Sequence, residues 1–357
     1  MPSSILAPEM PATIDPSTTL MFAEAREGGA AVRRFLDQNK APLAKLAAHL
    51  RANPPRSVTT CARGSSDHAA TFGKYLIETL LGVPTSSAAL SVSSIYAAPV
   101  VAEDSLCIAI SQSGRSPDLL TAVEAHKKAG AHIVALVNDE TSPLAELADT
   151  LLPLRAGPER SVAATKSYIA SLAGLAAIVA AWAGDEALQD ALDALPEQLE
   201  KAFALDWTPA LAVLTAARNL FVIGRGYGLA VAQEAALKLK ETCALHAEAF
   251  SSAEVRHGPM AIVGDGFPIL ALATVDTAGE GVREVAAEFT ERGAAVLLAD
   301  AAGPLEGAVH LPSLTTAPAL EPILLIQSFY RLANALSLAR GLNPDTPPHL
   351  NKVTRTV

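Results

Sequence analysis

Short, nearly unbroken runs of apolar residues alternate along the chain with longer segments in which apolar residues recur every three or four positions. A strand buried on both faces gives the first pattern, and an amphipathic helix gives the second. The apolar runs lie at residues 106–110, 133–137, 220–223, 268–273 and 295–298, and residues 58–61 are a further strand candidate. Helical patterns between them include residues 118–129 and 281–291. Such an alternation predicts an α/β fold in which doubly wound parallel sheets are flanked by helices.

Two stretches of the chain recur at almost the same interval. Residues 62–64 (Ala-Arg-Gly) and 224–226 (Gly-Arg-Gly) each precede a helix-like run and lie 162 positions apart. Residues 129–136 and 292–299 share a Gly-Ala pair followed by apolar residues and lie 163 positions apart. A shared interval indicates an internal duplication, although segments rich in Ala, Gly and Val also match by chance. The sequence therefore predicts two tandem lobes of one fold.

The same pattern divides the chain into five parts. We expect an N-terminal segment, a first lobe, a helical connector, a second lobe and a C-terminal tail at residues 1–39, 40–185, 186–204, 205–340 and 341–357. Residues 167–184 carry no formal charge, but Lys166 and Asp185 bound them closely and the run is short for a membrane span. We predict a buried core helix there and no membrane contact.

Composition narrows the range of partners. The 357-residue chain is 50% hydrophobic and 18% charged, which excludes a mostly disordered protein. Its net charge is −10 and it has no block of Lys or Arg, so nucleic acid is not an expected partner. An anionic substrate would have to be held by local groups. The N-terminus lacks the plan of a signal peptide, and we expect a cytoplasmic protein.

The three cysteines, Cys61, Cys107 and Cys243, are widely spaced among apolar residues. This spacing fits neither a disulfide framework nor a zinc cluster, and buried thiols are the usual outcome. His246 and Glu248 stand two residues apart, but no third ligand at a recognised spacing accompanies them. We therefore expect no metal.

The sharpest local motif is Ser111-Gln112-Ser113-Gly114-Arg115-Ser116-Pro117, directly after an apolar run. Ser116 is a good N-cap and Pro117 suits the first helical position, so a helix should begin there. Free N–H groups and the helix dipole at such a turn favour a phosphate. A second turn, Arg63-Gly64-Ser65-Ser66-Asp67-His68, follows the strand candidate at 58–61. Neither turn matches a nucleotide fingerprint, so the pair predicts a small phosphorylated metabolite, with a capped turn lacking a ligand as the alternative.

Ionisable residues gather in the second half of the chain. On a helix, Glu234, Lys238 and Glu241 have the spacing i, i+4 and i+7 and share one face. A surface ladder of ion pairs is the simpler interpretation. The surrounding Ala and Leu residues favour a partly buried carboxylate beside a lysine instead, which is a plausible base for proton transfer.

These residues, followed by residues 246–250 and 254–260, closely resemble the isomerase part of glucosamine-fructose-6-phosphate aminotransferases, a pair of SIS (sugar isomerase) domains. The resemblance extends through residues 111–116 and 157–166 and covers roughly residues 20–357. It implies two tandem SIS domains and a sugar-phosphate substrate. It also implies phosphate contacts from Gly64, Ser65, Ser66, Ser111, Gln112, Ser113 and Ser116, with Val162 and Ala164 touching the sugar.

The resemblance also implies the catalytic roles. Glu241 matches the carboxylate that moves a proton between sugar carbons 1 and 2, and His257 matches a ring-opening histidine supplied by a neighbouring subunit. Lys352 matches a tail lysine that closes over the substrate, and Lys238 matches a helix lysine that lines the pocket. A histidine supplied across subunits implies a homodimer with shared active sites.

Some positions depart from the aminotransferase pattern. Met1-Pro2 offers no glutaminase nucleophile, so we expect no built-in source of ammonia from glutamine. Asp67, Ala164 and Pro348 replace family residues, and residues 347–356 are more similar to stand-alone glucosamine-6-phosphate deaminases of SIS type. The leading hypothesis is therefore a deaminase that forms fructose 6-phosphate and ammonia without any cofactor, because the substrate carbonyl or imine accepts the electrons.

The sequence leaves two alternatives to a glucosamine-6-phosphate deaminase open. An aldose–ketose isomerase, or a deaminase of a galactosamine-type phosphate, would use the same base and the same hydroxyl residues. A sugar-phosphate-binding regulator would need the hydroxyl turns but not Glu241, His257 or Lys352. Regulators often carry a DNA-binding helix ahead of the module, and the N-terminal segment has no basic recognition helix.

Overall fold

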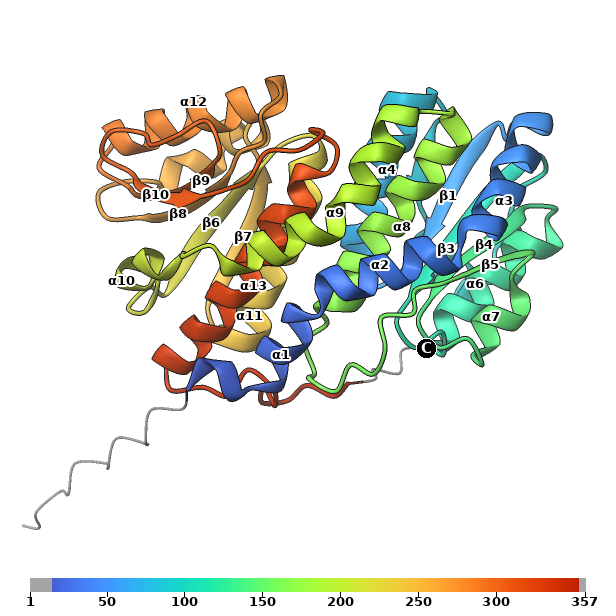
Figure 1. Cartoon of the computed structure of the whole chain (residues 1–357), viewed down its shortest axis with the longest axis horizontal. Coiled ribbons are helices and arrows are strands. Elements are labelled where there is room, and N and C mark those ends of the chain that lie inside the picture. The colour runs from blue at the N-terminus through green and yellow to red at the C-terminus, as the bar shows by residue number, and fades with distance from the viewer. Residues whose placement is uncertain (1–14, 353–357) are drawn as a thin grey trace, which may run out of the picture.

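Each half of the chain forms one five-stranded parallel sheet in the computed structural model, which describes residues 15–352 (Figure 1). The first sheet has the order β2-β1-β3-β4-β5 and the second β10-β9-β8-β6-β7. Counted from its own first strand, each sheet therefore has the order 2-1-3-4-5, which confirms the predicted tandem, doubly wound α/β fold. The strands are β1 (Ser57–Cys61), β2 (Thr85–Ser87), β3 (Ser105–Ser111), β4 (His132–Val137), β5 (Thr150–Pro153), β6 (Asn219–Gly224), β7 (His246–Ser251), β8 (Pro268–Leu272), β9 (Ala295–Asp300) and β10 (Val309–Pro312).

The five strands expected from apolar runs and the strand candidate at 58–61 are all present, as β3, β4, β6, β8, β9 and β1. The four strands that we did not predict, β2, β5, β7 and β10, lie at the edges of the sheets. An edge strand needs little apolar sequence because one side is open: in β7, His246 and Glu248 are exposed and only Ala247 is buried. The hydrophobic pattern therefore identifies the sheet centres and not their borders.

Helices cover both sheets. In the first half they are α1 (Leu20–Arg26), α2 (Gly28–Gln38), α3 (Lys40–Ala52), α4 (Ser65–Leu81), α5 (Ser91–Ser94), α6 (Pro117–Lys128), α7 (Pro143–Leu147) and α8 (Lys166–Ala183). The second half has α9 (Glu186–Ala204), α10 (Leu211–Leu214), α11 (Tyr227–Cys243), α12 (Thr277–Glu291) and α13 (Glu321–Ala339). The 3-10 turns are η1 (Pro16–Thr18), η2 (Thr208–Ala210), η3 (Glu254–His257) and η4 (Pro259–Ile262).

Local signals explain where these helices begin. α6 begins at Pro117 with Ser116 in the N-cap position, as predicted. α12 begins earlier than expected because the side chain of Asp276 accepts a hydrogen bond from Gly279 N at 3.0 Å and caps the helix. α9 fills the segment predicted as a connector, and it contains Pro196 in its interior.

The duplication is visible in the backbone. Gly64 precedes α4 with φ 55° and ψ −132°, and Gly226 precedes α11 with φ 56° and ψ −129°. Both helices have 17 residues. Glycine adopts this region readily and other residues do so only with strain, so the recurring Arg-Gly pair encodes one particular strand-to-helix turn.

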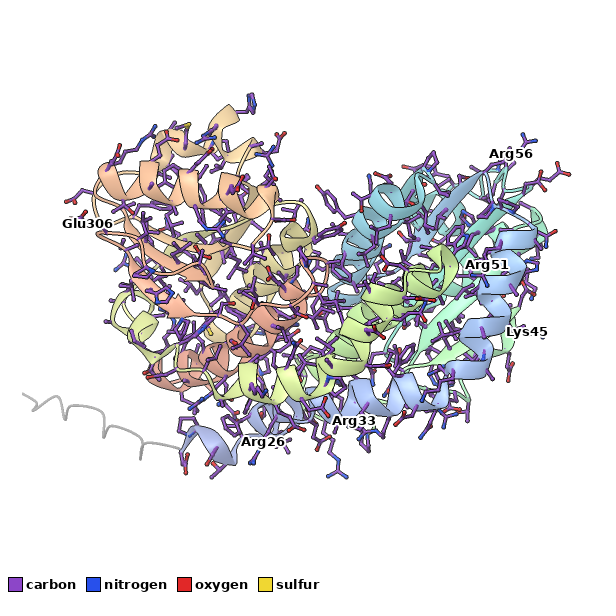
Figure 2. All side chains as sticks on the ribbon, turned by 45° about the horizontal axis from the view of Figure 1, so that its top comes forward. Arg26, Arg33, Lys45, Arg51, Arg56 and Glu306 are labelled. Atoms are coloured by element: carbon purple, nitrogen blue, oxygen red, sulfur yellow. The ribbon has the colours of Figure 1, made fainter. Side chains whose placement is uncertain are left out.

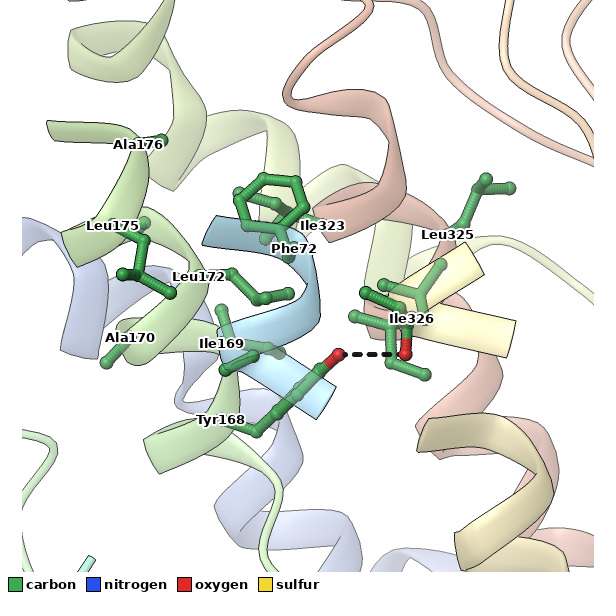
Figure 3. Close-up of a cluster of buried hydrophobic side chains, with 14 of the residues drawn as sticks. Phe72, Tyr168, Ile169, Ala170, Leu172, Leu175, Ala176, Ile323, Leu325 and Ile326 are labelled. Carbon is green, nitrogen blue, oxygen red and sulfur yellow. Dashed lines mark hydrogen bonds between the residues drawn. The ribbon is translucent and has the colours of Figure 1, made fainter. Parts of the chain in front are cut away.

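A shared hydrophobic core joins the two lobes. Phe72 of α4 and Tyr168 of α8 lie opposite Ile323 and Ile326 of α13 (Figure 3). The Tyr168 hydroxyl donates a hydrogen bond to the carbonyl oxygen of Ala230 in α11 at 3.3 Å. α8 is long and apolar enough to cross a membrane, yet 89% of its 18-residue window is buried inside the protein. It is the core helix that the sequence predicts.

The N-terminal helices α1, α2 and α3 pack their apolar faces onto this core, and most of their charged side chains point outward; Glu24 of α1 is buried. Arg26, Arg33 and Lys45 point away from the body of the protein (Figure 2). Arg33 lies 2.5 Å from Glu197 of α9, and both side chains are about half exposed. Such a surface pair adds little stability, so the buried faces of these helices hold them in place.

Candidate functional site

The centre of the first sheet carries the two serine-rich turns. β1 and β3 are neighbouring parallel strands, and the chain leaves their carboxyl ends in opposite directions to reach β2 and β4. Folds of this type bind ligands at such a switch point. The helices that follow the turns, α4 and α6, both begin here, and neither has a side chain that caps its N-terminus. The positive ends of their dipoles favour an anion.

A pocket of about 350 Å³ opens between the two turns. This volume suits a small metabolite. Nine of the site residues predicted from the sequence line it, together with Arg63, Ile110 and Leu119. The nine are Gly64, Ser65, Ser66, Ser111, Gln112, Ser113, Ser116, Ala164 and Lys352. We refer to the turns 63–66 and 111–116 as the serine cradle.

Within the serine cradle, the serines differ in their hydrogen bonding. Ser111 Oγ accepts a hydrogen bond from Gly114 N at 2.9 Å and so holds the turn in shape. Gly114 has φ +65°, and a Cβ atom there would lie 2.2 Å from Ser142 Oγ, so only glycine fits. Ser116 occupies the N-cap position without forming a cap hydrogen bond. Its hydroxyl is therefore free to bind a ligand.

Arg63 is a pocket residue that the sequence analysis did not select. Its Nε and Nη2 atoms lie 3.0 and 2.7 Å from Asp118 Oδ2 at the start of α6. Asp118 is buried, whereas about half of the Arg63 side chain is exposed. The pair fastens one cradle turn to the other and adds a positive charge at the rim. The feature of the sequence that could have identified Arg63 is the Arg-Gly pair that recurs in both lobes.

The C-terminal tail reaches the cradle through Lys352. Its Nζ atom lies 3.3 Å from Glu159 Oε2 and donates to the carbonyl oxygen of Ser161 at 2.8 Å. Glu159 is buried and also accepts a hydrogen bond from Ser167 Oγ at 2.7 Å. Val162 lies on the same loop, and its N–H faces the Asp345 carbonyl oxygen at 3.3 Å. Unlike Ala164, Val162 does not line the pocket. The tail residues 353–357 lie outside the described residues.

The three residues predicted to share a helix face do so on α11. Lys238 Nζ lies 3.5 Å from Glu234 Oε1 and donates a short hydrogen bond to Glu241 Oε2. The side chains of Glu234 and Lys238 are 0% and 1% exposed, and that of Glu241 is 23% exposed. A surface ladder of ion pairs is excluded by this burial. Glu241 is the most exposed member of the cluster, and neither Glu241 nor Lys238 lines the pocket at the cradle.

Buried Glu234 connects the two lobes. Its Oε2 atom lies 3.0 Å from His68 Nδ1 of α4, and its Oε1 atom accepts a hydrogen bond from the Tyr330 hydroxyl at 3.1 Å. Burial alone would raise the pKa of Glu234, but the charge of Lys238 and hydrogen bonds from His68 and Ser65 outweigh it and lower the pKa. Glu234 therefore stays ionised, and through His68 it links α4 to the α11 cluster.

Lys238 keeps its charge in the same environment. Burial opposes the charged form, but Glu234 and Glu241 on either side outweigh burial, and the pKa of Lys238 lies above its usual value. A charged lysine at this place can oppose negative charge that develops on a ligand near Glu241.

His257 is not brought to the cradle within one chain. It ends η3, its side chain is exposed, and it makes no hydrogen bond or ion pair with any of residues 15–352. It is also absent from the residues that line the pocket. The role that the resemblance implies for His257 therefore requires a second subunit.

Comparisons with known proteins identify the family to which the chain is similar. The family model of the SIS domain matches residues 52–181 and 213–301. The chain is 36% identical over 313 residues to a glutamine–fructose-6-phosphate aminotransferase from Symbiobacterium thermophilum, covering 83% of this chain and 51% of that protein. It thus spans about half the length of the curated relatives it matches.

Several solved structures have a fold similar to that of this chain. A protein provisionally assigned as a phosphosugar isomerase from Silicibacter pomeroyi is 43% identical, with a TM-score of 0.87 over 92% of this chain and all of that one. The C-terminal domain of an aminotransferase from Francisella tularensis has a TM-score of 0.83 at 25% identity, over 94% of this chain and all of that one. A glucosamine-6-phosphate deaminase from Thermotoga maritima, at 22% identity, shares the fold with a TM-score of 0.74 over 95% of this chain and all of that one. From its cradle to its second sheet, the chain belongs to the SIS domain family.

Proposed function

We propose that the protein is an amino-sugar phosphate deaminase that converts glucosamine 6-phosphate and water into fructose 6-phosphate and ammonia. The observation that carries this proposal is the continuous contact between an anion site and a base. His68, in the first turn of the helix that begins at the cradle, contacts Glu234; Glu234 pairs with Lys238, and Lys238 holds Glu241. In this proposal the cradle holds the phosphate, and the substrate extends beyond the residues that line the pocket to place its reacting carbons at Glu241.

The cradle supplies what a sugar phosphate needs. Hydroxyl groups of Ser66, Ser113 and Ser116 would donate hydrogen bonds to the phosphate, and the dipoles of the two helices that begin at the cradle would stabilise its charge. Arg63 and Lys352 add positive charge at the edge of the pocket. Local charge matters here because the chain has a net charge of −10 and does not attract anions over long distances.

The proposed reaction moves one hydrogen from carbon 2 to carbon 1 of the sugar. In the open-chain aldehyde, Glu241 takes the proton from carbon 2, and Lys238 opposes the negative charge that develops on the carbon 1 oxygen. Glu241 returns the proton to carbon 1, and a second proton passes from the amino nitrogen to the carbon 1 oxygen, which leaves a hydroxyl group on carbon 1 and an imine at carbon 2. Water adds to the imine carbon, ammonia leaves, and the ketone of fructose 6-phosphate remains. A positioned base contributes ~10²- to 10⁴-fold to the rate, and oriented charges supply more.

Ring opening is assigned to His257 of a partner subunit in this proposal. His257 is exposed and has no partner within residues 15–352, as expected of a residue that serves another chain. The protein would then be a homodimer in which each active site combines residues from both subunits. The sensor alternative gains no support from the α11 cluster, because two buried charges cost stability and a binding protein has no use for a base.

The deciding experiment is an ammonia-release assay on the purified protein. Glucosamine 6-phosphate alone should yield equal amounts of ammonia and fructose 6-phosphate, and added glutamine should change neither. The same assay with galactosamine 6-phosphate tests the sugar configuration at carbon 4. If only galactosamine 6-phosphate released ammonia, the substrate would be the galactosamine phosphate instead. If neither sugar were turned over but fructose 6-phosphate bound tightly, the proposal of an enzyme would be wrong.

A further inference from the structure

Two of the three cysteines lie side by side although 46 positions separate them in the sequence. Cys61 ends β1 and Cys107 lies in the neighbouring strand β3, and their Sγ atoms are 3.7 Å apart. The register pairs Thr59 with Cys107 and Cys61 with Ala109, so both thiols point to the same face of the sheet. Both are fully buried in the apolar cluster beneath α6.

His126, in the last turn of α6, completes the group. One nitrogen of its ring and the two sulfur atoms all lie within 4.8 Å of one another, and all three residues are buried. His126 Nδ1 lies 2.9 Å from the carbonyl oxygen of Ala122, which can only accept a hydrogen bond. Nδ1 therefore carries the proton and Nε2 carries the lone pair. A backbone carbonyl fixes metal-binding histidines in this way in many proteins.

We infer that Cys61, Cys107 and His126 form a binding site for one thiophilic divalent cation of the zinc type. Zinc–sulfur bonds of about 2.3 Å at a tetrahedral angle place two sulfur atoms roughly 3.8 Å apart, close to the observed 3.7 Å. Two thiolates neutralise a divalent ion and the imidazole adds no charge, so the filled site is neutral, as apolar surroundings require. Sulfur ligands exclude magnesium and calcium.

The site is separate from the proposed reaction but lies on the same strands. Neither cysteine lines the pocket. Cys61 stands three positions before Gly64, and Cys107 stands four positions before Ser111. A bound ion would tie β1 to β3 directly beneath the serine cradle. It would keep one coordination position for water or another small ligand, as zinc sites with three protein ligands do.

The test uses Cd²⁺, whose bonds to thiolates give an ultraviolet charge-transfer band. Reduced, metal-free full-length protein is titrated without oxygen, and the band should saturate at one equivalent. Cys107→Ser should abolish it. Cys243→Ser is the matched control, because Cys243 is also fully buried but lies in the other lobe, and it should leave the band unchanged. His126→Gln should keep the band and weaken Cd²⁺ binding by ~10-fold or more.

A second readout covers variants that fold poorly. Zn²⁺ should raise the melting temperature of the wild-type protein but not that of His126→Gln, whose side chain lies nearest the surface. Absence of the band in the wild-type protein, its persistence in Cys107→Ser, or its loss in Cys243→Ser would each overturn the inference. An equal Zn²⁺ effect on wild type and His126→Gln would do the same.

Discussion

Glu234 and His68 join the two copies of the repeated lobe: Glu234 Oε2 lies 3.0 Å from His68 Nδ1, and Glu234 is fully buried. His68 lies in the first turn of α4, and Glu234 lies in α11, the equivalent helix of the second lobe. One copy of this helix begins at the serine cradle and the other carries the candidate base. The contact between them therefore sets the position of the candidate base relative to the cradle.

Replacing the candidate base should abolish turnover. Glu241→Gln keeps the shape of the side chain but cannot take a proton, so kcat should fall by ~10²-fold or more while KM changes little. Ammonia release against glucosamine 6-phosphate concentration measures both. Glu248→Gln, on the exposed face of edge strand β7, is the matched control and should behave as wild type. Wild-type kcat in Glu241→Gln would rule out the assignment of the base.

Two serines of the cradle should respond differently to removal of the hydroxyl. Ser116 forms no cap hydrogen bond, so Ser116→Ala should raise KM several-fold without changing the melting temperature. Ser111 Oγ holds Gly114 N, so Ser111→Ala should also cost about 1 kcal/mol of stability. Kinetics combined with urea unfolding separates the two effects. Equal stability losses in both variants would contradict the hydrogen bonding described for this turn.

Glu234 should stabilise the protein in a pH-dependent way. Burial works against its ionisation, but Lys238 and His68 outweigh burial, and its pKa in the folded protein lies below the unfolded value. The stabilisation is thus fully present above the unfolded pKa of about 4.3 and is lost as pH falls through the folded pKa. Glu234→Gln should cost about 3 kcal/mol at neutral pH, because buried Lys238 loses a partner.

Urea unfolding of wild type and Glu234→Gln across the acidic range measures this dependence, and the difference between them should shrink below pH ~4. Tyr330→Phe is a graded comparison, since it removes one hydrogen-bond donor to Glu234 and no charge; it should cost about 1 kcal/mol. A difference between wild type and Glu234→Gln that stays constant with pH would mean that the carboxylate is not ionised.

The sequence could predict the fold because its signals are local. Apolar runs of the central strands and the Ser116-Pro117 helix start depend only on neighbouring residues, and all appear in the structure. Relationships between distant residues could not be predicted. The contact of His68 with Glu234 and the approach of Cys61 to Cys107 follow from strand order and lobe packing. Burial of Lys238 likewise depends on α4 and α13, which lie far from it in the sequence.

The proposed shared active site makes a quantitative prediction. If Glu241 and His257 of one site come from different subunits, mixing Glu241→Gln with His257→Ala chains gives heterodimers with one intact site and one doubly altered site. Random exchange makes half of the dimers heterodimers, so about a quarter of wild-type activity should return. Mixing Glu241→Gln with Lys238→Met is the control, because both residues lie on α11 of one chain and no intact site can form. No recovery with His257→Ala after exchange verified by mass spectrometry of tagged subunits would show that each site is built from a single chain. Recovery in the control would also contradict the prediction, because activity would then return without an intact shared site.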